Sequence, residues 1–277
     1  MRDKAEVIVV DNASPDFDVD DLRAAFPAVV FLPQESNTTY TKGNDIAASA
    51  ARGEYILLLN PDTIIASDAI ERGVAVLDAE PGLAAITARL LNPDGSLQRY
   101  YRRLPTLRDL PAFLLPPVFG HTPRGRRYLM LDDPFDRPTE VGQPPGAFIM
   151  LRRSSAPDPL LDPRYLNYGS DIALCRALLK NGAIEYRPEV QCVHERGAAG
   201  VRTTDVRERL RLHHDLTWGA RLYFAEDASV LGRIYLESWL VVFWVGRVAQ
   251  ILITRPRRTF DAIGVALRAL RGLRPAY

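Results

Sequence analysis

Short apolar runs alternate with helical patterns over the first ninety residues. The apolar runs occupy residues 7–10, 29–32, 55–59 and 83–87, and the patterns between them predict helices over 20–26, 46–51 and 67–77. An apolar run without a polar break is typical of a strand that is covered on both faces. Strands that alternate with helices in this way predict an α/β fold with a mostly parallel sheet flanked by helices.

The run at residues 55–59 is followed at once by Asn60-Pro61-Asp62. Pro61 lacks an N–H group and ends strand pairing, so the chain delivers a carboxylate to the carboxyl end of a buried strand. Open α/β sheets bind ligands at that edge. Asparagine, proline and aspartate are also common turn residues, and a simple turn is the alternative interpretation.

Polar segments follow two other strands of the predicted sheet. Asp11 and Asn12 come directly after the strand at 7–10, and Asp11 is suited either to a ribose or base contact or to an Asx turn. The polar segment 37–45 is predicted to be a loop that opens the helix at 46–51. Such a loop can hold a phosphate on backbone N–H groups, although helix starts are polar in any case.

The second half of the chain begins with a proline-rich excursion over residues 104–145, in which we expect short helices and a lid or a wall of an acceptor site. A strand at 146–151 and a helix at 172–180 follow, with Asp171 at the helix start. A negative charge is favoured there, so a helix cap is one role for Asp171. Strand-like pieces at 183–186 and 190–193 end at His194, for which a structural role is the alternative.

Composition argues against nucleic-acid binding. The 277 residues carry 35 Lys and Arg against 34 Asp and Glu, a net charge of +1, so no global field or basic–aromatic pattern favours nucleic acid. The two cysteines, Cys175 and Cys192, fit no metal spacing and are predicted to be small buried side chains in a reducing compartment. No signal peptide is visible at the amino terminus.

Six segments, in this order, resemble the inverting nucleotide-sugar glycosyltransferases of family 2, which have the GT-A fold, and within them the rhamnosyltransferase-like branch. The resemblance extends from about residue 7 to about residue 200. It is carried by residues 9–14, 37–44, 57–62, 90–98, 146–153 and 162–176, and by the strand end at His194. Each motif alone is weak, and their order along the chain makes them specific.

The resemblance implies a glycosyltransferase domain over residues 1–200, with a nucleotide half at 1–100 and an acceptor half at 101–200. It implies that Asp62 binds Mg²⁺ or Mn²⁺, with His194 reaching the metal or the diphosphate, and that Asp171 is the base for the acceptor hydroxyl. A divalent cation suits a leaving diphosphate, and direct displacement needs such a base. The donor-binding residues that it implies are Asp11, Asn12, Asn37, Gly43, Asn44 and Asn60.

Departures from the family pattern support a second hypothesis. Ser170 stands where the family has glutamate, Thr39 and Asp45 replace a glycine and an asparagine, and the family's opening, central strand is absent. The first hypothesis is an inverting transferase that moves a sugar, rhamnose in this branch, from a nucleotide sugar to a glycan or lipid-linked acceptor in cell-envelope polysaccharide synthesis. The second is a non-catalytic scaffold or binding subunit of a glycan-assembly complex.

Residues 201–277 predict a helical tail. A charged helix is expected over 203–224, with His213-His214-Asp215 as solvated surface rather than a metal site. The apolar stretch at 239–253 falls short of the roughly 20 residues that span a bilayer. Arginines and an amphipathic segment at 260–273 follow, which suits peripheral contact with an anionic membrane at the cytoplasmic face. Packing on the catalytic domain and a dimer contact are the alternatives.

Overall fold

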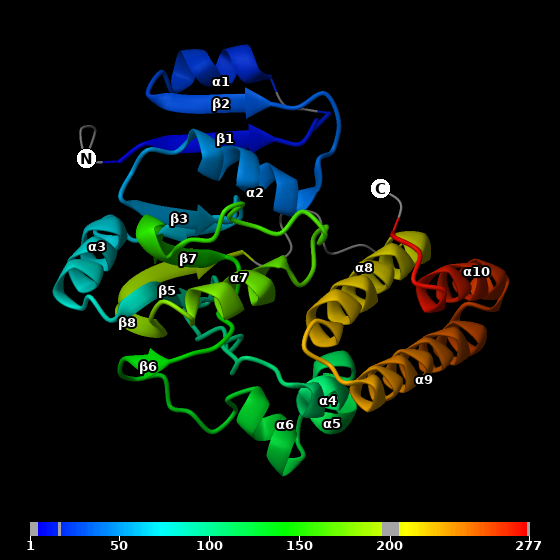
Figure 1. The fold of residues 1–277 in the computed structure, drawn as a ribbon. Helices are drawn as coiled ribbons and strands as arrows, with labels where there is room; N and C mark the ends of the chain where they lie inside the picture. The colour runs from blue at the N-terminus through cyan, green and yellow to red at the C-terminus, as the bar shows by residue number, and fades with distance from the viewer. Residues whose placement is uncertain (1–4, 16–17, 196–204, 276–277) are drawn as a thin grey trace.

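The computed structural model describes residues 5–15, 18–195 and 205–275 (Figure 1). The strands are β1 (Val7–Asp11), β2 (Val29–Pro33), β3 (Tyr55–Leu59), β4 (Thr63–Ile65), β5 (Leu83–Leu91), β6 (Thr139–Glu140), β7 (Phe148–Arg152) and β8 (Ala183–His194). The α-helices are α1 (Val19–Ala25), α2 (Thr39–Ala50), α3 (Ala69–Ala79), α4 (Leu110–Leu114), α5 (Pro116–Phe119), α6 (Pro123–Tyr128), α7 (Ser170–Leu178), α8 (Val206–Ala225), α9 (Val230–Thr254) and α10 (Thr259–Leu270).

The sheet is mixed and is divided into two parts. A six-stranded sheet has the order β3-β7-β5-β8-β4, with β6 paired to β8, and β1 and β2 form a separate parallel pair. Strand β7 is antiparallel to both of its neighbours, because the chain returns from the 104–145 excursion and runs back between β3 and β5. The predicted α/β sheet flanked by helices is confirmed, whereas its mostly parallel character is wrong.

Helices cover both faces of the larger sheet. Ala69 and Leu77 of α3 pack with Ile86 and Phe148 in one apolar cluster, and Leu174 and Leu178 of α7 pack in a second cluster with strand residues of the opposite face. Burial on both faces is what the unbroken apolar runs predicted. Cys175 and Cys192 lie in these clusters as free, buried thiols, as expected.

Two elements differ from their predicted bounds because of contacts with distant segments. Helix α2 begins at Thr39, so residues 39–45 are helical rather than a loop. Its first N–H groups find partners outside the helix, and Tyr40 N donates to Asn167 Oδ1 at 2.9 Å. Strand β8 is continuous over 183–194, and a register shift against β5 between Ala88 and Arg89 accommodates the polar Arg187-Pro188-Glu189 segment that separated the two predicted pieces.

The tail helices α8, α9 and α10 pack on one another and share an apolar cluster with α4 and with Tyr165 and Ile172. The prediction that His214 and Asp215 are solvated is wrong, because their exposed fractions are 4% and 0%. Asp215 Oδ2 accepts hydrogen bonds from Asn167 N and Nδ2 at 3.1 and 3.0 Å, which ties α8 to the loop before α7. The domain boundary at residue 200 and the helix start at Thr203 lie outside the described residues.

Helix α9 is longer than the sequence pattern indicated. It begins at Val230, nine residues before the predicted apolar stretch, because Leu231, Ile234 and Tyr235 continue the apolar pattern toward the amino terminus. It is the one helix in the described part of the chain with the length and apolar composition to cross a membrane, so the expectation that it falls short is wrong. Length and composition alone do not distinguish a spanning helix from a packed one.

Candidate functional site

Asp62 and His194 meet where β4 pairs with β8. Thr63 lies opposite His194 in this antiparallel pair, and Glu195 N donates to Asp62 O at 2.8 Å. The register places the two side chains together, with His194 Nε2 at 3.3 Å from Asp62 Oδ1. Both side chains are largely removed from solvent, with exposed fractions of 6% for Asp62 and 13% for His194. The sequence predicted both residues but not the short strand that brings them into contact.

Gln98 fixes the orientation of His194. Gln98 Nε2 donates to the backbone carbonyl of His194 at 2.7 Å, so the amide oxygen must be the atom that lies 3.0 Å from His194 Nδ1. An amide oxygen only accepts, and Nδ1 therefore carries a proton. In the neutral imidazole, Nε2 then turns a lone pair toward the Asp62 carboxylate, an arrangement that is favourable only with a proton or a cation at that position.

The same pair fits a divalent cation. Asp62 Oδ1 is buried and has no hydrogen-bond partner in the described residues, and a carboxylate with an imidazole is a donor set that Mg²⁺ or Mn²⁺ accepts. A separation of 3.3 Å is close to the roughly 3 Å between adjacent ligands of an octahedral ion. Within the described ranges no group of three His, Cys, Asp or Glu residues surrounds a metal position, so the remaining ligands would be water or phosphate oxygens.

Asp171 lies in the first turn of α7, facing the segment before β7. Gly169 begins this helix with φ of 91°, a conformation that glycine adopts without strain. Burial raises the pKa of the Asp171 carboxyl, against the opposing effects of backbone N–H groups at the helix start and of the Arg102 guanidinium. A carboxyl with a raised pKa holds an accepted proton more firmly than an ordinary aspartate does.

Gly146 and Ala147 lie between the two candidate carboxylates. Asn60 N continues the pairing of β3 by donating to Ala147 O at 3.2 Å. A Cβ on Gly146 would lie 4.0 Å from the Cβ of Asp171 and 3.1 Å from the Tyr40 hydroxyl. The Asn60-Pro61-Asp62 turn and Asp171 therefore both lie next to the Gly146-Ala147 segment that precedes β7.

Arg102 carries a positive charge that acts on Asp171. Its guanidinium lies over the Tyr128 ring at 5.8 Å from the centroid, and Nη1 donates to Tyr128 Oη at 3.5 Å. Tyr128 in turn donates to Gln143 Oε1 at 3.3 Å. Arg99, Arg102 and Arg103 are close together in the sequence, but the sequence does not indicate that the charge of Arg102 lies near Asp171, and the fold shows it.

Several of the residues predicted to bind the donor form a connected network around the start of α2. Asn12 Oδ1 accepts from Thr38 Oγ1 at 2.6 Å and from Thr38 N at 3.3 Å, and Gly43 packs against Asn12 in the second turn of α2. Both carboxylate oxygens of Asp11 accept from Ser14 N at 3.2 Å, a local bond within the loop that reaches one residue further than an Asx turn. These residues shape the loop after β1.

The backbone N–H groups at the start of α2 already have partners. Thr39 N donates to Asn37 Oδ1 at 2.8 Å and Thr41 N donates to Leu166 O at 3.0 Å, in addition to the bonds of Thr38 and Tyr40. Asn44 Nδ2 donates to Tyr40 O at 2.8 Å. A donor contact from this segment would therefore come from side chains rather than from a free row of N–H groups.

The comparison with protein-family models matches residues 1–156 to glycosyl transferase family 2. The chain belongs to this family. The match covers both the loop after β1 and the Asn60-Pro61-Asp62 turn, and it ends just after β7. The resemblance read from the sequence is thereby confirmed at the level of the family.

A curated relative of this chain is a rhamnosyltransferase. The N-acetylglucosaminyl-diphospho-decaprenol L-rhamnosyltransferase of Mycobacterium tuberculosis is 27% identical over an alignment of 230 residues that covers 76% of this chain and 73% of the relative. The aligned part of this chain is longer than the 156 residues of the family match, so the likeness extends beyond that match. The chain is thus a family 2 glycosyltransferase with a rhamnosyltransferase homologue.

Solved structures share the fold. The mannosyltransferase PcManGT of Pyrobaculum calidifontis, solved with GDP-Man and Mn²⁺, aligns with a TM-score of 0.51 at 16% identity over 98% of this chain and 78% of that one. The S. aureus TarS 1–349 structure aligns with a TM-score of 0.48 at 13% identity over 98% of this chain and 73% of that one. The family match and the alignment with PcManGT confirm the predicted GT-A fold.

Proposed function

We propose that this protein is an inverting, metal-dependent glycosyltransferase that moves rhamnose from a nucleoside-diphosphate donor to a hydroxyl of a lipid-linked glycan in cell-envelope polysaccharide synthesis. The observation that carries the proposal is the pairing of Asp62 with His194, together with the placement of the Asn60-Pro61-Asp62 turn and Asp171 next to the same segment, Gly146-Ala147. The choice of rhamnose and of a lipid-linked acceptor is supported by the name of the mycobacterial relative.

Direct displacement assigns distinct tasks to Asp171 and to the Asp62–His194 pair. Asp171 takes the proton of the acceptor hydroxyl as its oxygen attacks the anomeric carbon of the donor. The new carbon–oxygen bond forms on the face opposite the breaking bond to phosphate, so the anomeric configuration inverts and the nucleoside diphosphate leaves. The raised pKa of Asp171 matches this role, because a base titrating nearer neutral pH holds the transferred proton more firmly.

Asp62 and His194 would hold the Mg²⁺ or Mn²⁺ ion, whose charge, when bound, offsets the charge that develops on the departing diphosphate. Gln98 keeps Nε2 of His194 turned toward that position. Asn60 lies two residues before Asp62, and Asn12, Asn37, Gly43 and Asn44 belong to the loop after β1 and to the start of α2. We assign these residues, with Asp11, to the donor side. A lipid-linked acceptor would place the enzyme at the cytoplasmic face of the membrane.

A second candidate function is a non-catalytic scaffold subunit. Ser170 favours it, because this residue stands where the family has glutamate and its side chain is fully buried, with Oγ lacking a hydrogen-bond partner in the described residues. A scaffold predicts no metal-dependent binding of nucleotide sugars. Calorimetry with nucleoside-diphosphate sugars, with and without Mn²⁺, separates the two functions before any acceptor is available.

The decisive experiment is a transfer assay with a nucleoside-diphosphate rhamnose, an N-acetylglucosaminyl-diphospho-polyprenol acceptor and Mn²⁺, with the product anomer determined by NMR. We expect an inverted linkage, and Asp171→Asn is expected to lose about 10²- to 10⁴-fold in turnover while it retains donor binding. Asp21→Asn, at an exposed aspartate of α1, is the control with the same change of charge. Full turnover by Asp171→Asn, or a retained configuration, would refute the assignment.

A further inference from the structure

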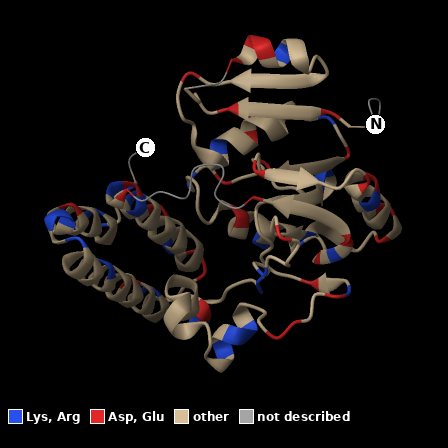
Figure 2. Ribbon diagram, turned by 180° about the vertical axis from the view of Figure 1, so that it is seen from behind, with Lys and Arg blue, Asp and Glu red and all other residues tan. Residues whose placement is uncertain are grey.

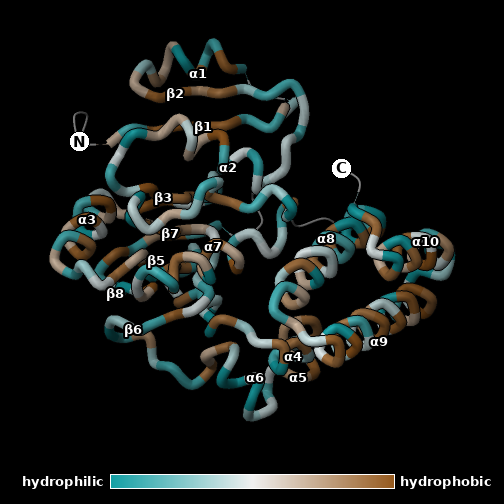
Figure 3. Tube along the Cα trace, viewed as in Figure 1, coloured by the Kyte–Doolittle hydropathy of each residue, from teal (hydrophilic) through white to brown (hydrophobic). Residues whose placement is uncertain are grey.

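An apolar stripe runs along the solvent-facing side of α9. Its residues fall on one face of the helix, with polar Ser238 in the gap between Tyr235 and Val241. Over residues 231–253 the stripe extends about 33 Å. Figure 3 shows the apolar character of this helix along most of its length. The exposed apolar members, with exposed fractions from 38% to 81%, are Leu231, Ile234, Tyr235, Val241, Val242, Val245, Leu252 and Ile253.

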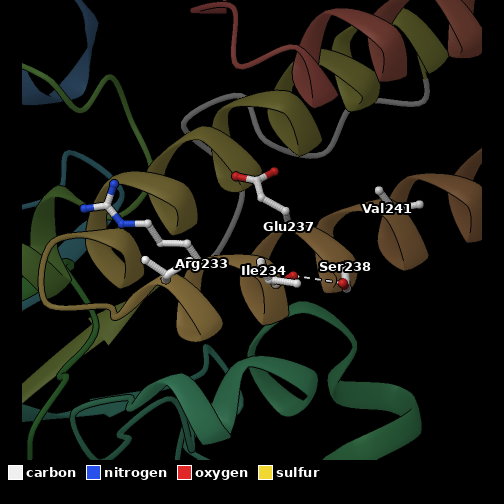
Figure 4. Close-up of a pocket in the computed structure, with 6 residues that line it drawn as sticks. Arg233, Ile234, Glu237, Ser238 and Val241 are labelled. Carbon is white, nitrogen blue, oxygen red and sulfur yellow. Dashed lines mark hydrogen bonds between the residues drawn. The ribbon is translucent and has the colours of Figure 1, made fainter.

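The opposite side of α9 is fixed to the rest of the protein. Leu236, Leu240, Phe243 and Trp244 are each 1% exposed and belong to the apolar cluster shared with α4, α8 and α10. Glu237 pairs through both oxygens with Arg221 of α8 at 2.7 Å, and Figure 4 shows Glu237 reaching toward α8 while Ile234 and Ser238 lie along the other side of the helix. A membrane-spanning position would require these buried contacts to break.

Helix α10 extends the apolar surface and arginines border it. Phe260 is 87% exposed and Leu267 is 50% exposed, again at helical spacing. Figure 2 shows Lys and Arg positions, in blue on the ribbon, at the end of the tail where α9 meets α10. In the described part of the chain, no ion pair involves the arginines Arg255, Arg257, Arg268 and Arg271.

We propose that the exposed apolar residues of α9 and α10, with these arginines, form a docking face for an anionic lipid bilayer. Helix α9 lies flat at the interface, its stripe in the acyl boundary and the arginines among the headgroups. Charge complementarity favours lipid over a second copy of the chain, because self-pairing would bring unpaired arginines together. This docking face rests on the proposed function, because it would bring the enzyme to a lipid-linked acceptor. Binding of the face to vesicles is measured without donor or acceptor.

The test is flotation of the full-length protein with phosphatidylcholine vesicles that contain phosphatidylglycerol, and with vesicles of phosphatidylcholine alone. Two paired variants address the two parts of the face. Leu252→Glu with Ile253→Glu is expected to weaken binding at least tenfold by removing buried apolar area. Arg255→Gln with Arg257→Gln is expected to weaken binding about 25-fold, at about fivefold for each arginine.

Matched controls lie on other faces of the molecule. Phe26→Glu replaces an apolar side chain that is 55% exposed, close to the 56% of Leu252, at the end of α1. Arg137→Gln with Lys180→Gln removes two exposed positive charges away from the tail. Both controls are expected to bind vesicles like the wild type, and all variants are expected to retain the circular dichroism spectrum of the wild type.

Three outcomes overturn the proposal. The first is equal binding of the wild type to anionic and neutral vesicles, which would remove the role of the arginines. The second is retention on membranes after alkaline carbonate extraction, which would indicate a spanning helix. The third is a lipid-free dimer in analytical ultracentrifugation that Leu252→Glu with Ile253→Glu converts to monomer. Loss of transfer activity with intact vesicle binding would count against the proposed reaction alone.

Discussion

His194 Nε2 lies 3.3 Å from Asp62 Oδ1, and Gln98 determines that this nitrogen, rather than Nδ1, faces the carboxylate. The relationship depends on one strand register and one side-chain hydrogen bond. The pairing of Thr63 with His194 sets the approach of the two residues, and the bond from Gln98 Nε2 to His194 O sets the ring orientation. The pair is therefore prearranged to receive a positive ion.

Asp62→Asn and His194→Gln should each remove the thermal stabilisation that Mn²⁺ gives to the wild type. An ion bound only by the folded protein adds about 2.7 kcal/mol to the free energy of unfolding at a concentration 100-fold above its dissociation constant. Scanning calorimetry with and without Mn²⁺ measures this difference, with Asp21→Asn as the control. Equal stabilisation of all four proteins would place the metal elsewhere.

Gln98→Leu tests the positioning of His194 without removing a ligand. The leucine keeps the volume but frees Nδ1 and the imidazole ring, and we expect a 10- to 100-fold loss of Mn²⁺ affinity. We also expect an increase in KM for the donor that is larger than the fall in kcat. Gln191→Leu, at an exposed glutamine of β8, the strand that carries His194, is the control. A variant that merely unfolds would show a lower kcat and a lower thermal stability together, without the selective increase in KM for the donor.

Arg102→Gln should move the acid limb of the pH–rate profile to higher pH. The Arg102 guanidinium lowers the pKa of Asp171, which burial raises, so removing that charge leaves the rise unopposed. The profile of kcat/KM then falls at a higher pH in Arg102→Gln than in the wild type. Arg103→Gln, an exposed neighbour paired with Asp133 at 3.5 Å, should leave the limb in place, and an equal shift in both variants would argue for a general charge effect.

Asp171→Asn should stabilise the fold at neutral pH. The folded-state pKa of Asp171 is raised above its unfolded value near 3.9, so the native state binds more protons than the unfolded state between those two values. The contribution of Asp171 to stability is present below pH of about 3.9 and is lost as the pH rises through the folded-state pKa. Urea unfolding at several pH values should show that the free energy of unfolding of the variant rises relative to that of the wild type over that window and remains higher at pH values above it.

The tail core should lose stability in acid through His213. Burial lowers the pKa of His213 to about 4, and its ring packs edge-on against Phe243 at 5.6 Å between centroids. Between pH of about 6.5 and about 4 the imidazole of His213 is protonated in the unfolded state but not in the folded state. The free energy of unfolding therefore falls as the pH drops through this range. His213→Phe should reduce this slope, and an unchanged slope would exclude His213 as the acid-sensitive group.

Sequence reasoning succeeded where a pattern is local. The strand at 55–59 was predicted with its observed bounds, because five apolar residues are closed by Pro61, and Asp62, Asp171 and His194 were each found at an element end. It failed where a distant segment supplies the partner. The start of α2 depends on Asn167, more than a hundred residues away, and a lone glutamine such as Gln98 has no periodic signal.

The sheet is divided between β1 and β3, and within the described residues β1 pairs only with β2 and β3 only with β7. Each of these two strands thus has one edge whose N–H and C=O groups make no strand pairing. Such edges accept a strand from another molecule, and Val7, 52% exposed, gives one of them an apolar end. Concentrated preparations of this chain are therefore expected to self-associate by edge-to-edge β-pairing, and a peptide with alternating apolar residues should compete with that association.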